Sequence, residues 1–309
     1  MQLLEFRAMG CHMLAALDSD SQPTANLLRV PGWFEKWEQQ LSRFREASEL
    51  NHLNRNAGRW VQVGSVIWEM MQVALQAAEW SEGLVVPTLL NAVEAAGYDR
   101  SFELIGEAGN PNAELVRSNT PVFDGQWPAI DRNPGNRSIR LPNGVRVDFG
   151  GVAKGWAADR AARRLGQHGP ALIDAGGDIA ISGPLIDGQP WPIGIDDPTN
   201  PNRQIGLLHV CQGGIATSGR DYRRWQRNGV WQHHIIDPRI GLPAQTDVLS
   251  ATVIGPTTLE AEVAAKAALI LGSEAGLKWL EARPQFAGLL ILESGQVLHS
   301  HQMKNYLEN

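Results

Sequence analysis

The sequence predicts an α+β fold, in which short strands joined by tight turns are separated by blocks of helix. Helical periodicity is clear in three blocks, at 30–56, 64–82 and 257–272. The strand candidates are short, and several follow one another as hairpins. A regular strand–helix alternation, which would predict a doubly wound parallel sheet, is absent from this pattern.

In the N-terminal half, residues 3–17 are expected to form a first strand that ends at Asp18. Apolar residues recur at helical spacing in 30–56 and again in 64–82, where Gly83 provides a natural stop. A third helix is expected over about 87–97. Several prolines mark 105–145 as loops and short strands, with a hairpin turn at Asn143-Gly144.

The C-terminal half begins with a helix over 154–169 and continues mainly as strands. A strand over 171–183 is interrupted by Gly176 and Gly177, which indicates a bulge or a close approach of the backbone to a ligand. A capped helix is expected over 257–272 and a short one over 276–284. The remaining predicted strands are 191–198, 205–211, 213–219, 233–243, 249–255 and a closing hairpin over 287–300.

Composition restricts the class of protein. The 309 residues are 43% hydrophobic and 19% charged, as in ordinary globular chains, and the net charge of -6 argues against a nucleic-acid-binding protein. No apolar run is long enough for a membrane span, and the N-terminus lacks a basic signal-peptide region. Cys11 and Cys211 are far apart, and both are expected to be buried thiols. We therefore expect a cytoplasmic protein with a single domain over 1–309.

Four segments carry the residue types of a phosphate-binding site. In VDFGGVAKGW, Lys154 opens a helix directly after a glycine turn, and a helix N-terminus with a lysine suits phosphate. LIDAGGDI contains the double glycine, and ATSGRDYRR carries three arginines. In HHIIDPRIG, His234 is a candidate general base. Each segment alone also fits a structural turn, a bulge, a solvated basic loop or a structural histidine.

Together and in this order, the segments resemble the family of FAD:protein FMN transferases, also called ApbE proteins. The resemblance covers nearly the whole chain. It includes Met9-Gly10, the block SRFREASELNHLN (42–54), GLVVPT, VDFGGVAKG, LIDAGGDI, ATSGRDY, HHIIDPRIG and AEVAAKAALILG. The family fold has mixed or antiparallel sheets with packed helices, and its ligand site lies between two halves. Its members bind FAD and magnesium, transfer FMN to a Thr or Ser hydroxyl of a target flavoprotein, and release AMP.

The resemblance also implies roles for single residues. His234 corresponds to the base that takes the proton of the attacking hydroxyl, and the Gly151 carbonyl corresponds to a metal ligand. The positions that correspond to FAD contacts, or that lie close to them, are Met9, Phe44, Asn54, Asp148, Lys154, Ser218, Gly219 and Ile236.

The sequence departs from the family pattern at its metal site. The family helix usually reads Ala-Asp-Ala-Leu-Ala-Thr, with Asp and Thr as magnesium ligands, whereas this chain has Glu262 and Lys266. A carboxylate still binds a hard cation, but an ammonium has no lone pair to offer. A second departure is Val86, in place of a family acid, and a smaller one is Asp174, in place of Asn.

The spacing i, i+4 with the acid first favours an ion pair between Glu262 and Lys266. Two interpretations are open: Lys266 acts as a fixed positive charge in place of magnesium, with a catalytic role, or the pair is only a salt bridge in a decayed site. Magnesium is correspondingly doubtful as a cofactor. The leading function is FMN transfer from FAD, and the alternatives are a non-catalytic FAD-binding protein, an FAD pyrophosphatase and a scaffold that has lost the ligand.

Overall fold

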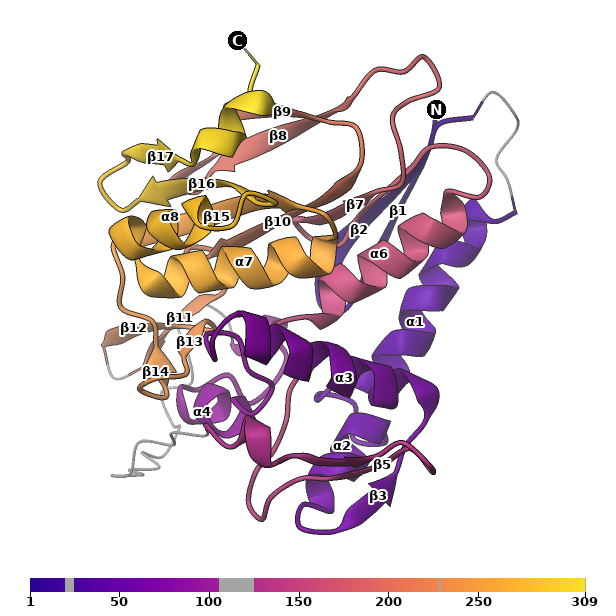
Figure 1. Cartoon of the computed structure of the whole chain (residues 1–309), viewed down its shortest axis with the longest axis vertical. Helices are drawn as coiled ribbons and strands as arrows, with labels where there is room; N and C mark the ends of the chain where they lie inside the picture. The colour runs from indigo at the N-terminus through magenta and orange to yellow at the C-terminus, as the bar shows by residue number, and fades with distance from the viewer. Residues whose placement is uncertain (20–24, 106–124, 228, 309) are drawn as a thin grey trace. The chain divides into compact units, whose positions relative to one another are not determined.

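The computed structural model describes residues 1–19, 25–105, 125–227 and 229–308. The chain folds into two compact units. Unit 1 consists of 1–35, 153–221 and 246–309, and unit 2 consists of 36–152 and 222–245. Figure 1 gives the labels of the elements. The prediction of one functional domain over 1–309 stays a prediction.

Unit 1 is built on an eight-stranded sheet in which all neighbouring strands are antiparallel. In spatial order the strands are β1 (Gln2–Ala8), β2 (Cys11–Leu17), β6 (Ala171–Asp174), β7 (Asp178–Ile181), β10 (Gly213–Gly219), β15 (Val248–Gly255), β16 (Ala287–Leu292) and β17 (Val297–His299). This sheet, with the helices packed on it, confirms the predicted α+β class.

Helices cover one face of this sheet: α6 (Ala153–Leu165), α7 (Thr258–Leu271) and α8 (Ser273–Glu281) (Figure 1). α7 lies against β10, β15 and the other two helices, and most of its residues are buried. Alanines and close glycines make this possible: a Cβ at Gly214 would lie 2.0 Å from Thr258 N, and one at Gly276 would lie 2.3 Å from Ala268 O. The sequence thus keeps side chains small where α7 meets its neighbours.

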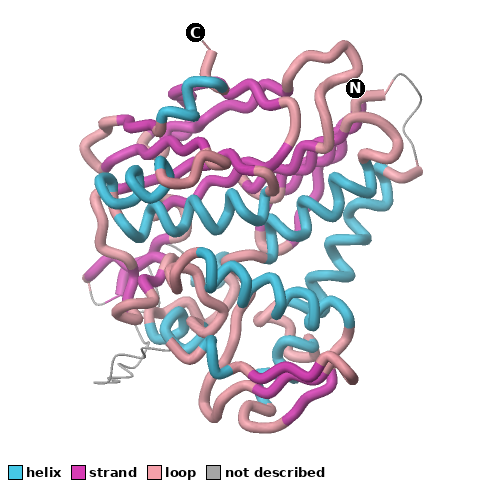
Figure 2. Tube along the Cα trace, viewed as in Figure 1, coloured by secondary structure: helices cyan, strands magenta, loops and turns pink. Residues whose placement is uncertain are grey.

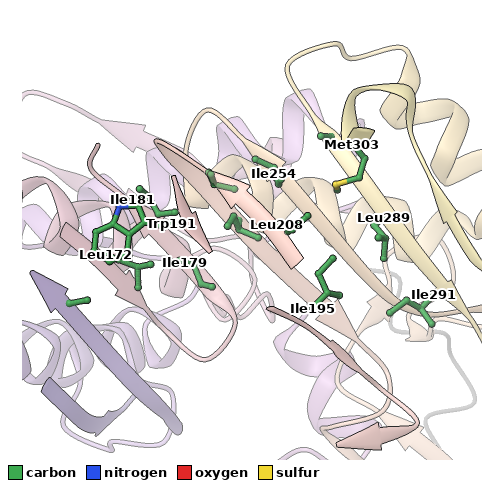
Figure 3. Packing of buried hydrophobic residues seen from close by; sticks show 14 residues of the cluster. Leu172, Ile179, Ile181, Trp191, Ile195, Leu208, Ile254, Leu289, Ile291 and Met303 are labelled. Carbon is green, nitrogen blue, oxygen red and sulfur yellow. The ribbon is translucent and has the colours of Figure 1, made fainter. Parts of the chain in front are cut away.

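The other face of the sheet packs on the hairpin of β8 (Trp191–Asp197) and β9 (Asn200–Val210) and on the 3-10 helix η3 (His301–Asn305). Ile179 and Ile181 of β7 belong to one buried cluster with Trp191, Leu208 and Met303 (Figure 3). Because side chains alternate along a strand, the residue between the two isoleucines points to the helix face. The core of unit 1 therefore has three layers: helices, sheet and hairpin.

Unit 2 combines helices with small sheets, as Figure 2 shows by colour. Its helices are α2 (Glu49–Arg55), α3 (Ser65–Trp80), α4 (Leu90–Ala95), α5 (Phe102–Ile105) and η2 (Trp127–Ala129). β3 (Trp60–Gln62), β5 (Ser138–Arg140) and β4 (Asp131–Asn133) form a three-stranded sheet. Two hairpins follow: β11 (Arg224–Arg227) with β12 (Val230–His233), and β13 (Ile236–Asp237) with β14 (Leu242–Pro243).

The core of unit 2 fixes the first of these hairpins. Trp225 of β11 is 1% exposed and packs with Tyr98 and Ile236. Its indole N–H donates a hydrogen bond of 3.0 Å to the Ala96 carbonyl at the end of α4. Burial of a tryptophan side chain with its N–H paired is strongly stabilising, so β11 is anchored to the helical part of the unit.

Two of the predicted elements in the N-terminal half are wrong in their extent. Residues 3–17 form a hairpin and not one strand, because Met9 and Gly10 adopt φ of 50° and 68°, as a two-residue hairpin turn requires. The predicted helix over 30–56 is two helices, α1 (Val30–Leu41) and α2. Ser48 caps the second helix through Asn51 N, and the Asn51 amide donates to backbone carbonyls of the loop before it.

The Asn143-Gly144 turn forms, with Gly144 at φ 77° and Val145 N bonded to Pro142 O. The hairpin expected around it does not, since β5 pairs with β3 and β4 instead. The predicted helices at 64–82, 154–169 and 257–272 are confirmed as α3, α6 and α7, and those at 87–97 and 276–284 as α4 and α8 with shifted ends. Of the loop-rich segment 105–145, residues 106–124 lie outside the described residues.

The expectation of two buried thiols is wrong for Cys211, which is exposed, and Cys11 is only partly buried; neither cysteine is in a disulfide bond. Over the described part of the chain, the helices are too short or too polar to cross a membrane.

Candidate active site

An ion pair on α7 is the most buried charged feature of the predicted site. Lys266 Nζ donates a hydrogen bond of 2.9 Å to Glu262 Oε1, one helical turn earlier. The other carboxylate oxygen, Oε2, accepts a 2.9 Å hydrogen bond from the Gly155 backbone N–H. The Glu262 side chain is 0% exposed and that of Lys266 is 15% exposed. Both oxygens of Glu262 are therefore engaged inside unit 1.

Glu262 reaches the start of α6 because Gly155 has no side chain. A Cβ there would lie 2.8 Å from Leu259 N and 2.9 Å from Glu262 Oε2. Gly155 N is one of the first N–H groups of α6, which have no partner within the helix. The carboxylate thus satisfies one of these donors and lies at the positive end of the helix dipole.

A second ion pair lies beside the first. Lys154 Nζ donates a hydrogen bond to Asp178 Oδ2 at the start of β7. Asp178 follows Gly176 and Gly177, which have φ of 70° and 90°. Asp174 Oδ1 accepts a 2.7 Å hydrogen bond from Gly177 N and so fixes this turn. The double glycine interrupts the predicted strand over 171–183, but it forms the turn of a hairpin between the antiparallel strands β6 and β7 and not a bulge in one strand. This turn places Asp178 within hydrogen-bonding reach of Lys154.

Burial and mutual attraction act against each other in these pairs. Burial raises the pKa of Asp178 to about 6, because desolvation and the negative charge of Glu262 outweigh the attraction of Lys154. Burial would lower the pKa of Lys154, but Asp178 and Glu262 outweigh it and raise that pKa above its ordinary value. Burial would likewise raise the pKa of Glu262, yet Lys266 and Lys154 hold it below its usual range. The four side chains form one interacting group, which we call the tetrad.

Three more of the predicted FAD contacts lie in unit 1. Met9 occupies the β1–β2 turn. Ser218 and Gly219 are at the end of β10, where they pair with Ala251 and Ser250 of β15. Ser218 is 6% exposed. The structure brings Lys154, Glu262 and Lys266 together, and it places Ser218 and Gly219 on a strand that also contacts α7.

In unit 2, Arg43 connects two predicted site residues. Its guanidinium lies 4.2 Å from the centroid of the Phe44 ring and 4.5 Å from that of Tyr98. Arg43 Nε is 4.0 Å from Asp148 Oδ1, and Nη1 donates to the Tyr98 carbonyl at 2.7 Å. Phe44 is 43% exposed. Arg43 therefore contacts both an exposed aromatic ring and a carboxylate.

Asn54 fixes the backbone next to Asp148. Its Nδ2 donates to the Val147 carbonyl at 2.9 Å, and its Oδ1 accepts from Val147 N at 2.8 Å. Asp148 N in turn donates to the Pro87 carbonyl at 2.8 Å. These bonds explain why 145–149 need no partner strand. Within this structure Asn54 positions Asp148, and its contact with FAD stays a prediction.

The two adjacent histidines have different surroundings. His233 is 8% exposed, and its Nε2 lies 3.0 Å from the Ala244 carbonyl. His234 is half-buried in the bend between β12 and β13, with Nδ1 3.4 Å from the Arg223 carbonyl. Ile236 is buried in the core of unit 2. Of the two rings, His234 is the one with exposure suited to a general base.

The residues on α7 do not fit a magnesium ion. Both Glu262 oxygens already accept hydrogen bonds, and the Lys266 ammonium lies where it would repel a cation. No group of three or more His, Cys, Asp or Glu side chains in the described ranges could hold a metal. Gly151 lies in the turn before α6, and its role as a metal ligand stays a prediction.

Three residues of this arrangement were not predicted as site residues: Arg43, Tyr98 and Asp178. Arg43 immediately precedes Phe44, and Asp178 immediately follows the double glycine, so the motifs themselves could have indicated both. Tyr98 has no comparable sequence signal, because only the fold brings it to Arg43.

Curated relatives match most of the chain. An FAD:protein FMN transferase of Klebsiella pneumoniae is 35% identical over 280 residues, which cover 88% of this chain and 79% of that protein. One of Treponema pallidum is 30% identical and covers 85% of this chain and 76% of that protein.

Solved structures agree with the fold. An ApbE protein of Thermotoga maritima matches with a TM-score of 0.87 and 25% identity, over 100% of this chain and 99% of that one. A flavinyl transferase ApbE of Pseudomonas stutzeri, 23% identical with a TM-score of 0.80, covers 98% of this chain and 96% of its own, and it supports the fold alone. The model of the ApbE family matches residues 9–290, and the chain belongs to the ApbE family.

Proposed function

We propose that this chain is an FAD:protein FMN transferase, which moves FMN from FAD to a Thr or Ser hydroxyl of an acceptor flavoprotein. The curated relatives that match most of its length carry this activity in their names. The observation in the structure that carries the proposal is the position of Lys154: it is the second residue of α6, directly after a glycine turn, and its ammonium pairs with Asp178 beside this helix N-terminus. A helix N-terminus and an ammonium group together favour the binding of a pyrophosphate.

The proposed reaction is a displacement at phosphorus. The acceptor hydroxyl oxygen attacks the phosphorus of the FMN half, the bond from that phosphorus to the bridging oxygen breaks, and AMP leaves with the bridging oxygen. His234 takes the hydroxyl proton, a role for which its half-buried ring is suited. Since the protein forms no covalent bond to the substrate in this reaction, catalysis consists of positioning and charge neutralisation.

The other proposed FAD contacts are those that the resemblance to the family implies. Lys154, Ser218, Gly219 and Met9 in unit 1, and Asp148 with Phe44 in unit 2, are assigned to the ligand. Asn54 acts through the backbone next to Asp148, and Ile236 through the core beneath the His234 bend.

The test is an incubation of the purified protein with FAD and a peptide that carries an acceptor Thr, followed by chromatography of FAD, FMN, AMP and the peptide. Flavin-labelled peptide with an equal amount of AMP is the expected result. Free FMN with AMP and no labelled peptide would indicate a pyrophosphatase instead. Bound but intact FAD would indicate a carrier protein.

We also propose a cytoplasmic location, supported by two cysteines that are not in a disulfide bond, which suits a reducing compartment. Cell fractionation with an antibody against the chain tests this, and recovery from an oxidising compartment would contradict it.

A further inference from the structure

We infer that the Glu262–Lys266 ion pair replaces the divalent metal ion of this family's site, so that FAD binding by this chain does not depend on magnesium. The inference rests on the proposed function, because it assigns the Lys266 ammonium to the pyrophosphate of FAD. Lys266 is then the fixed cation of the site, and Glu262 is the residue that positions it.

The hydrogen bonds explain why a metal is not accommodated. A hard cation needs carboxylate lone pairs, but one Glu262 oxygen accepts from Lys266 and the other from the α6 N-terminus. Freeing either oxygen would leave a buried donor without a partner, at a cost of about 1–3 kcal/mol. The ion would also have to approach an ammonium that lies 2.9 Å from the same carboxylate.

A purely structural role explains the pair less well. Beyond its first turn, α7 is otherwise apolar, and glycines lie close against it at several points. Ion pairs in such surroundings contribute little to stability, because desolvation offsets their attraction. Lys266 also interacts with Asp178 in the tetrad, so two ammonium groups and two carboxylates are concentrated where three elements meet. Buried charge of this density is typical of functional sites.

The Lys266 ammonium has the properties that a pyrophosphate requires. It keeps 15% exposure while its partner has none, so the positive end of the pair is the accessible one. An ammonium carries three N–H donors, and among the described residues one is bonded to Glu262. Lysine binds phosphate as a point charge without metal-coordinated water. Glu262 holds this charge in place, which limits the entropy lost when FAD binds.

The experiment is a fluorescence titration of FAD with the intact protein, in EDTA and in magnesium. The test variant is Glu262→Gln/Lys266→Met, which neutralises both partners and leaves no unpaired charge. The matched control is Glu274→Gln/Lys278→Met, the same i, i+4 spacing on α8, where both positions are exposed. Glu262→Asp/Lys266→Thr restores oxygen ligands for a metal. Thermal unfolding of each variant verifies that it is folded.

Equal affinity of the wild type in EDTA and magnesium is expected, with at least tenfold weaker binding by Glu262→Gln/Lys266→Met and no change in the control. Glu262→Asp/Lys266→Thr should bind FAD more tightly in magnesium than in EDTA. Wild-type binding that requires magnesium would overturn the inference and leave the transferase function intact. Unchanged affinity of Glu262→Gln/Lys266→Met would also overturn it and reduce the pair to a salt bridge.

The proposed function can be refuted separately from this inference. Metal-independent FAD binding that needs Lys266, without transfer to any acceptor, would refute the transferase and support the inference. Absence of FAD binding in both EDTA and magnesium would overturn both.

Discussion

The Thr258 backbone N–H donates a 2.9 Å hydrogen bond to Asp159 Oδ1, so α7 begins against a carboxylate from α6. Asp159 Oδ2 accepts a second bond, of 3.0 Å, from Leu259 N. The side chain of Thr257 adds the ordinary N-cap through Glu260 N. The first turn of α7 is thereby joined to the second turn of α6, and these two helices carry three members of the tetrad, Lys154, Glu262 and Lys266.

We predict that Asp159→Ala lowers the free energy of unfolding by about 2 kcal/mol, since it leaves two helix N–H donors without a partner. Urea unfolding measures this. Glu308→Ala, at an exposed position, is the control and should change stability by less than about 0.5 kcal/mol. If Asp159→Ala lowers the free energy of unfolding by no more than the control does, the hydrogen bonds of Asp159 contribute nothing to stability.

Gly155→Ala should destabilise the protein and weaken FAD binding. Its Cβ would meet Leu259 N at 2.8 Å and Glu262 Oε2 at 2.9 Å, so the helices or the carboxylate must move. We expect a loss of about 1–3 kcal/mol, typical of overpacking. At Gly32, in α1, an added Cβ has nothing within 4 Å. Gly32→Ala should therefore stabilise the protein by about 0.4–1 kcal/mol, and equal behaviour of the two variants would contradict the close contact.

His234→Gln should lower the rate of FMN transfer about 10²–10⁴-fold and leave FAD affinity within a factor of two or so, because a general base acts in the transition state. The contrast is His233→Gln, which removes a buried ring bonded to the Ala244 carbonyl and should lower the melting temperature. Single-turnover kinetics and thermal unfolding separate the two effects. Transfer by His234→Gln at the wild-type rate would exclude it as the base.

The pH dependence of stability should reveal the buried carboxyl of Asp178. Its pKa is raised to about 6 in the folded protein from an ordinary 3.8, so the folded state binds the proton more tightly than the unfolded state. Its contribution to stability is complete below pH 3.8 and is lost as the pH rises through about 6. The stability of the wild type relative to Asp178→Asn should therefore fall by roughly 1–3 kcal/mol over this interval.

Asp247→Asn provides a control of opposite sign. Hydrogen bonds from Ser273 lower the pKa of Asp247, so its contribution is present above pH 3.8 and is lost as the pH falls. A flat difference between wild type and Asp178→Asn from pH 4 to 6 would show that Asp178 does not titrate there.

The sequence by itself determined the elements that are encoded locally. The apolar spacing of 64–82 gave α3, the Thr257 cap and following alanines gave α7, and β-branched residues gave β15. The order of short motifs was enough to indicate the family, and the i, i+4 spacing was enough to predict the Glu262–Lys266 pair. These features depend on neighbours in the chain, so periodicity and capping reveal them.

Only the tertiary structure decided which partners those residues have. The sequence does not show that the second Glu262 oxygen is used by Gly155, 107 residues away, or that Asn54 holds Val147 in place of a strand. The motif indicated His234 as the base, but the sequence could not show how its surroundings differ from those of His233, since the carbonyl beside each ring comes from another segment. Hydrogen-bond partners and desolvation arise from packing between distant segments. This packing is the physical reason why both oxygens of Glu262 have hydrogen-bond donors without a metal.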